Sequence, residues 1–187
     1  MTTNSIQRYY QEVEKLKQRG STKMESTVSQ AFYTLLNDYA QQKELTLVPQ
    51  VWVKGKLGRK VKPDGTLKDS LRQDWGYWES KDEADDIDEE IEKKFARGYP
   101  DVNILFEDSN TAVLIQGGHE IIRAPFNNAT ALDAILKTFV SYQRPEVETF
   151  RKAIELFKED VPNVTETLRN VMAQAEKHNK FYVQAGK

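Results

Sequence analysis

The sequence contains no cysteine and only two histidines among its 187 residues. No disulfide framework or thiolate zinc cluster can therefore form, and the wide separation of His119 and His178 argues against zinc chemistry. The first residues lack a basic segment followed by an apolar one, and no apolar run approaches the length of a membrane span. From these absences we expect a soluble, cytoplasmic protein without a membrane partner.

A strong excess of charge of either sign is also absent. The 27 basic and 29 acidic residues give a net charge of −2, which differs from the basic surface typical of an autonomous nucleic-acid binder. If DNA is the substrate, we expect other parts of a larger protein to hold it. The hydrophobic fraction of 39% is sufficient for a folded core, and the length is near that of one domain.

Hydrophobic spacing predicts a mixture of helices and strands. The expected helices cover 5–18, 25–39, 84–97 and the region from 131 onward, where Pro145 and Pro162 separate further helices at 147–158 and 164–178. The expected strands cover 45–53, 76–81, 102–106, 111–116 and 120–124, with a hairpin-like excursion within 53–71. From residue 25 to 106 this gives the order helix, strand, strand, strand, helix, strand. We expect a core over 1–125 and a helical extension over 126–187.

Alternation in the strand at 76–81 places a carboxylate beside an ammonium. Side chains two apart in a strand share one face, so Tyr77, Glu79 and Lys81 project together. A carboxylate can hold a hard cation such as Mg²⁺, while a lysine orients water and offsets negative charge during phosphodiester hydrolysis. The adjacent aromatic residues predict a buried strand, where charges are costly unless they serve a site. The alternative interpretation is a chance Glu-x-Lys that forms a weak surface ion pair.

A second carboxylate from a neighbouring strand would complete such a metal site. Asp64, about one hairpin upstream, is the first candidate, and Asp69 and Asp74 are alternatives that the sequence does not exclude. A carboxylate cluster of Asp82, Glu83, Asp85 and Asp86 resembles a metal-binding loop. It is better explained as the start of a helix, where negative charge complements the helix dipole.

Three further charged residues have two interpretations each. Glu25 on an early helix could reach the same metal, or it could be a glutamate favoured by the helix N-terminus. Lys93 and Lys94 could approach DNA phosphates, or they could simply be solvated at the end of a helix.

Several stretches resemble one enzyme family. Roughly residues 25–160 are similar to the N-terminal nuclease region of single-chain type I-like restriction-modification enzymes, known as type ISP. The stretches that carry the resemblance are GYWESKD at 76–82, DDIDEEI at 85–91, GYP at 98–100, NILFED at 103–108 and AVLIQ at 112–116.

The resemblance implies an α/β (α+β) PD-(D/E)xK nuclease core of order α-β-β-β-α-β, with an extra hairpin and a C-terminal helical appendage. In the family pattern Asp64 and Glu79 correspond to the metal-binding acids and Lys81 to the catalytic lysine. The implied cofactor is Mg²⁺, for which Mn²⁺ can substitute, and the implied substrate is double-stranded DNA. Linked translocase and methyltransferase domains and a transient dimer on DNA are implied partners. The competing hypothesis is a catalytically inactive module of the same fold that contacts DNA or docks other domains.

Overall fold

The computed structural model describes residues 2–18, 24–143 and 145–178. The chain divides into two compact units, residues 1–142 and 143–187. Within the described ranges, a helix suited to crossing a membrane is absent.

A six-stranded sheet forms the centre of the first unit, with the strand order β1-β4-β5-β6-β7-β8. The pair β5–β6 is parallel and is joined through the helix α3 (Ile87–Ala96), whereas the other neighbours are antiparallel. The strands of this sheet are β1 (Thr46–Pro49), β4 (Gly65–Lys68), β5 (Asp74–Ser80), β6 (Asn103–Glu107), β7 (Thr111–Gln116) and β8 (His119–Pro125). A separate ribbon consists of β2 (Val53–Lys54), the short helix η1 (Lys56–Gly58) and β3 (Lys60–Val61).

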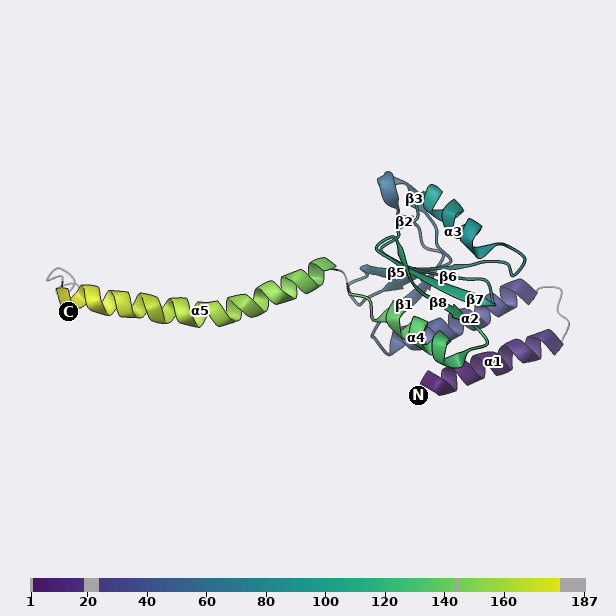
Figure 1. Cartoon of the computed structure of the whole chain (residues 1–187), viewed down its shortest axis with the longest axis horizontal. Coiled ribbons are helices and arrows are strands. Elements are labelled where there is room, and N and C mark those ends of the chain that lie inside the picture. Colours follow the sequence, from purple (N-terminus) through teal and green to yellow (C-terminus); the bar gives the residue numbers. More distant parts are fainter. Residues whose placement is uncertain (1, 19–23, 144, 179–187) are drawn as a thin grey trace. The chain divides into compact units, whose positions relative to one another are not determined.

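Helices cover both faces of the sheet (Figure 1). On one face, α1 (Thr2–Gln18), α2 (Met24–Gln41) and α4 (Ala129–Val140) pack on Trp78 and Leu105. On the other face, α3 and the β2–β3 ribbon pack on Tyr77 and Phe106. The alternation expected for the strand at 76–81 is therefore present, because neighbouring residues of β5 enter different clusters. Glu79 lies on the α3 face, two residues after Tyr77.

When the β2–β3 ribbon is left out, the succession α2, β1, β4, β5, α3, β6 agrees with the order expected from the sequence. The single strand expected at 45–53 is wrong: β1 ends at Pro49 and Val53 belongs to the ribbon. Gln50 has a left-handed φ of 49°, which turns the chain out of the sheet. Glutamine gives no sequence signal for this conformation, so the break was not predicted.

Asp86 caps the N-terminus of helix α3 and so defines where the helix begins. The Asp86 carboxylate accepts hydrogen bonds from the backbone N–H groups of Asp88 and Glu89, at 2.9 and 3.2 Å. Such an N-cap stabilises a helix by about 1 kcal/mol. Ile87 and Ile91 are buried against the sheet, and this fixes the face of α3 that looks toward β5.

The C-terminal third differs from the expectation in two ways. The helix α4 buries Leu132, Ile135 and Phe139 against the sheet, so the first unit extends to Tyr142 instead of ending at residue 125. In the second unit, a single helix α5 (Pro145–His178) continues through Pro162, where two helices were expected. Proline removes one N–H donor and commonly kinks a helix, but the helix does not have to end there.

Candidate active site

The β4–β5 hairpin brings two acids together at one end. Gly65 pairs with Trp78 in antiparallel register, so Asp64 lies across from Glu79. The half-buried Asp64 accepts a hydrogen bond from the backbone N–H of Ser80 at 3.1 Å. This contact fixes the first-choice acid beside the strand that carries Glu79 and Lys81.

Glu79 is fully buried, with a relative exposure of 0%. Its Oε2 atom accepts a hydrogen bond from Lys94 Nζ and lies 3.3 Å from Lys81 Nζ. Its Oε1 atom is buried and, among the described residues, has no hydrogen-bond partner. Because an unsatisfied buried carboxylate oxygen is costly, this atom is the main unexplained feature of the site.

Lys81 is also withdrawn from solvent, with its side chain 11% exposed. Its ammonium group lies 3.7 Å from Glu90 on α3, and its backbone N–H donates to the carbonyl of Glu107 at 2.7 Å. The Glu79–Lys81 pair therefore differs from the weak surface ion pair that was the alternative interpretation.

Lys94 on α3 is a member of this site that the sequence analysis had assigned to a DNA contact or to solvent. Besides its bond to Glu79, its Nζ lies 3.3 Å from the Tyr99 hydroxyl, which donates to the Lys62 carbonyl at 3.1 Å. The available signal was helical spacing: Lys94 follows Ile91 by three positions, so it lies on the face of α3 that packs on the sheet.

Electrostatic effects at Glu79 oppose each other. Burial and then the negative charge of Asp64 raise the pKa of the Glu79 carboxyl, whereas Lys94 and Lys81 lower it. Burial also raises the pKa of the Tyr99 hydroxyl, and the nearby Glu79 raises it further. The repulsion from Asp64 is expected from its position across the β4–β5 pair from Glu79.

The alternative acids lie elsewhere. Asp74 forms an ion pair with Lys68, and Asp69 accepts from the Gln73 N–H at 2.8 Å, both at the turn end of the β4–β5 hairpin. Asp64 and Glu79 occupy the opposite end of the same hairpin.

Of two other sequence candidates, Lys93 does not join the site in the described structure. Lys93 is 54% exposed and pairs with Glu90 on its own helix, at 2.9 Å. Glu25 is in the first turn of α2, and its side chain lies outside the described part of the chain.

The available donors suit a hard divalent cation. Asp64 and Glu79 lie opposite each other across the β4–β5 pair. Within the described ranges, no group of three or more His, Cys, Asp or Glu residues could hold a metal. Two carboxylates are enough for Mg²⁺, which commonly keeps several waters and adds substrate phosphates. A cation beside Glu79 would satisfy its unpartnered Oε1 atom, so the residues fit such an ion.

A second buried acid, Glu107, lies on the opposite face of the sheet from Glu79. Glu107 on β6 is 1% exposed, and its Oε2 accepts from the Ser109 N–H at 3.0 Å. It follows Leu105 by two positions and therefore lies on the α1–α2 face, away from Glu79. Burial raises the pKa of the Glu107 carboxyl to about 7, although contacts with Ser80 and Ser109 lower it.

We expect Glu107 to make stability depend on pH. Its folded pKa of about 7 exceeds the ordinary value of 4.5, so its contribution is complete below pH 4.5 and is lost as the pH rises through 7. The loss should approach about 3 kcal/mol. Urea unfolding of the parent and Glu107→Gln across this range measures it. The glutamine variant should lack this part of the pH dependence, and identical pH profiles would contradict the expectation.

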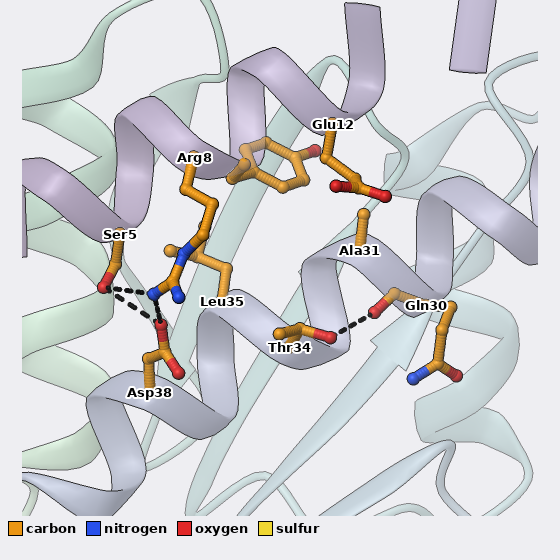
Figure 2. Close-up of a pocket in the computed structure, with 9 residues that line it drawn as sticks. Ser5, Arg8, Glu12, Gln30, Ala31, Thr34, Leu35 and Asp38 are labelled. Carbon is orange, nitrogen blue, oxygen red and sulfur yellow. Dashed lines mark hydrogen bonds and ion pairs between the residues drawn. The ribbon is translucent and has the colours of Figure 1, made fainter. Parts of the chain in front are cut away.

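A pocket between α1 and α2 offers no comparable chemistry (Figure 2). Its volume is about 260 Å³. Arg8 forms an ion pair with Asp38 at 2.5 Å, and Ser5 donates to the same carboxylate at 3.0 Å. The charges of Arg8 and Asp38 in this pocket therefore already neutralise each other. The pocket lies on the face of the sheet opposite Glu79.

Comparison with known proteins finds similarity among solved structures. No family model and no curated protein matches the chain. Seven chains of solved structures match. One belongs to the cryo-electron-microscopy structure of a DrdV–DNA complex, with 45% sequence identity, a TM-score of 0.81 and coverage of 94% of this chain. This chain spans 17% of the length of that chain. At this identity and TM-score, the two share the mixed α/β architecture described above.

Proposed function

We propose that this chain is a Mg²⁺-dependent DNA endonuclease domain with a PD-(D/E)xK core. The observation that carries the proposal is the position of Asp64 across the β4–β5 pair from Glu79, with Lys81 Nζ 3.3 Å from Glu79 Oε2. The buried Oε1 atom of the same carboxylate has no hydrogen-bond partner in the described structure. The succession of helices and strands and the similarity to a chain from a DNA complex support it. The retained pair of acids and the retained lysine favour an enzyme over the inactive module.

Each residue has a distinct role in this mechanism. Asp64 and Glu79 provide the anionic oxygens that would hold the cation. The Lys81 ammonium donates hydrogen bonds to the attacking water or to a phosphate oxygen, and its positive charge stabilises the negative charge that develops at phosphorus. Lys94 holds the Glu79 carboxylate in place. When bound, a divalent cation acts as a Lewis acid and lowers the pKa of water.

The resemblance to type ISP enzymes extends the proposal to the setting of the domain. Double-stranded DNA is the proposed substrate, and translocase and methyltransferase domains linked to this one are the proposed partners. The near-neutral net charge of the chain is consistent with DNA that is bound partly by these other domains.

Metal dependence provides a direct test. The protein should convert supercoiled plasmid to nicked circles with Mg²⁺ or Mn²⁺, and excess chelator should stop the reaction. Calorimetric titration should show metal binding to the parent and a strong loss of binding in Asp64→Asn, because one of two carboxylate ligands is removed. Asp69→Asn, at the other end of the hairpin, is the matched control and should bind like the parent. Nicking that proceeds equally well in chelator would refute the proposal.

A further inference from the structure

The segment Trp52–Lys62, named here the basic arm, has two different faces. Val53 and Val61 are buried against the α3 face of the core and pair with each other across the ribbon. Lys54 pairs with Lys60, and both side chains are exposed. Trp52, just before β2, and Lys62, just after β3, are also exposed. The burial of the valines thus directs an aromatic residue and three lysines toward solvent.

Charge is concentrated in this arm although the whole chain is nearly neutral. Residues 54–62 contain five basic residues and no acidic one. Lys56 is paired with Asp101 at 2.5 Å, and Arg59 donates to the Ala96 carbonyl at 3.1 Å. In the described part of the chain, Lys54, Lys60 and Lys62 have no such partners, so three ammonium groups are available to an anion.

The arm is held in a defined position. Its Gly55 N–H donates to the Arg59 carbonyl at 2.7 Å, and its Lys56 N–H donates to the Gly98 carbonyl beyond α3 at 2.8 Å. A Cβ atom on Gly55 would lie 2.2 Å from the Gly98 oxygen, so the backbones approach closely. The lysines therefore extend from a fixed ribbon whose orientation is set by α3.

The arm leads directly into the candidate active site. The Lys62 carbonyl accepts from Tyr99, whose hydroxyl lies beside the Lys94 ammonium that binds Glu79. Asp64 follows two residues later, at most about 7 Å further along an extended chain. A strand of DNA in contact with the arm would thus be close to both acids.

The outer surface of the arm has a shallow hollow of about 360 Å³. Its lining includes Trp52, Lys54 and Lys60, and Trp52 is 65% exposed. Lysines bind phosphates, which supply much of the affinity of a protein for DNA. The hollow therefore places the ammonium groups of Lys54 and Lys60 beside an exposed aromatic ring that can pack against the sugars of the same backbone.

We propose that the basic arm binds the sugar-phosphate backbone of double-stranded DNA and guides it to the acids at Asp64 and Glu79. This inference rests on the proposed function, because it names the surface that delivers the substrate to that site. It also accounts for DNA contact by a chain with little net charge, since the interaction depends on local positive charge.

Binding measurements with chelator present test the arm separately from cleavage. The parent is compared with the triple variant Lys54→Gln, Lys60→Gln, Lys62→Gln by fluorescence anisotropy of a short labelled DNA duplex. The control triple variant Lys43→Gln, Lys158→Gln, Lys177→Gln makes the same change of net charge. The arm variant should bind about tenfold more weakly or worse at low salt. The plot of log affinity against log salt has a negative slope, and its magnitude should decrease by about 0.9 for each phosphate that a lysine no longer neutralises.

The outcomes separate this inference from the proposed function. An arm variant that matches the parent in affinity and salt slope would overturn the inference, and so would a parent that binds no duplex at low salt. Equal losses of affinity in the arm and control variants would show a general charge effect and would also overturn it. If the arm variant alone loses binding but the parent never cuts DNA with metal, the arm proposal stands and the nuclease proposal fails.

Discussion

Replacement of Glu79 by glutamine is expected to reduce metal-dependent nicking by about a thousandfold or more. Glutamine keeps the size of the side chain but removes the charge that would hold the cation. A metal ion contributes several kcal/mol of transition-state stabilisation, and each 1.36 kcal/mol corresponds to about a tenfold change in rate. Initial nicking rates on supercoiled plasmid at saturating Mg²⁺ measure the effect.

Glu89→Gln is the matched control for this experiment. Glu89 lies on the nearby helix α3, but its side chain is 70% exposed and pairs with Lys93. We expect parental nicking rates from this variant. Thermal melting of Glu79→Gln establishes whether the fold is retained, and calorimetry should show weakened metal binding in the folded variant. A folded Glu79→Gln protein that nicks at the parental rate would refute the role of Glu79.

Replacement of Lys81 by methionine should slow nicking by roughly a hundredfold to ten-thousandfold, the usual contribution of one proton-transfer or hydrogen-bonding group in a catalytic site. Methionine retains most of the apolar stem of lysine and removes the ammonium that lies 3.3 Å from Glu79 Oε2. Because Lys81 is a cation, its removal should not abolish metal binding. Single-turnover nicking rates and calorimetric metal titration together separate the two effects.

Lys93→Met is the corresponding control. Lys93 belongs to the same charged neighbourhood and contacts Glu90, but its side chain is 54% exposed and does not contact Glu79 in the described structure. Its removal should leave the nicking rate close to that of the parent. If Lys81→Met and Lys93→Met have equal rates, Lys81 has no special part in the reaction. If Lys81→Met instead loses metal binding, the lysine supports the ligands and does not assist the water.

The proximity of Glu79 and Lys81 could be predicted from the sequence because it depends on local geometry. Strand alternation placed Glu79 and Lys81 on one face, and both belong to a single short segment. The choice of Asp64 over Asp69 and Asp74 needed the register of the β4–β5 hairpin, which is a property of paired strands. The sequence ranked Asp64 first, but only the pairing of Gly65 with Trp78 places it opposite Glu79.

Other features depend on contacts between distant segments and were missed. Lys94 was expected in solvent or on DNA because its helix end carries several charges, yet it reaches Glu79 on β5. The five basic residues at 54–62 can be counted in the sequence. The net charge of −2, taken over the whole chain, gave no indication of this locally basic segment. Only the burial of Val53 and Val61 shows which side of that segment faces outward.

The position of α3 would connect the proposed active site with the proposed DNA-binding arm. One face of this helix supplies Lys94 to Glu79, while the chain at its C-terminal end supplies the carbonyls of Ala96 and Gly98 to Arg59 and to the Lys56 N–H. Any displacement of the helix would shift both Lys94, the counter-ion of Glu79, and the β2–β3 ribbon. Local opening at α3 would therefore disrupt both proposed sites in one cooperative event.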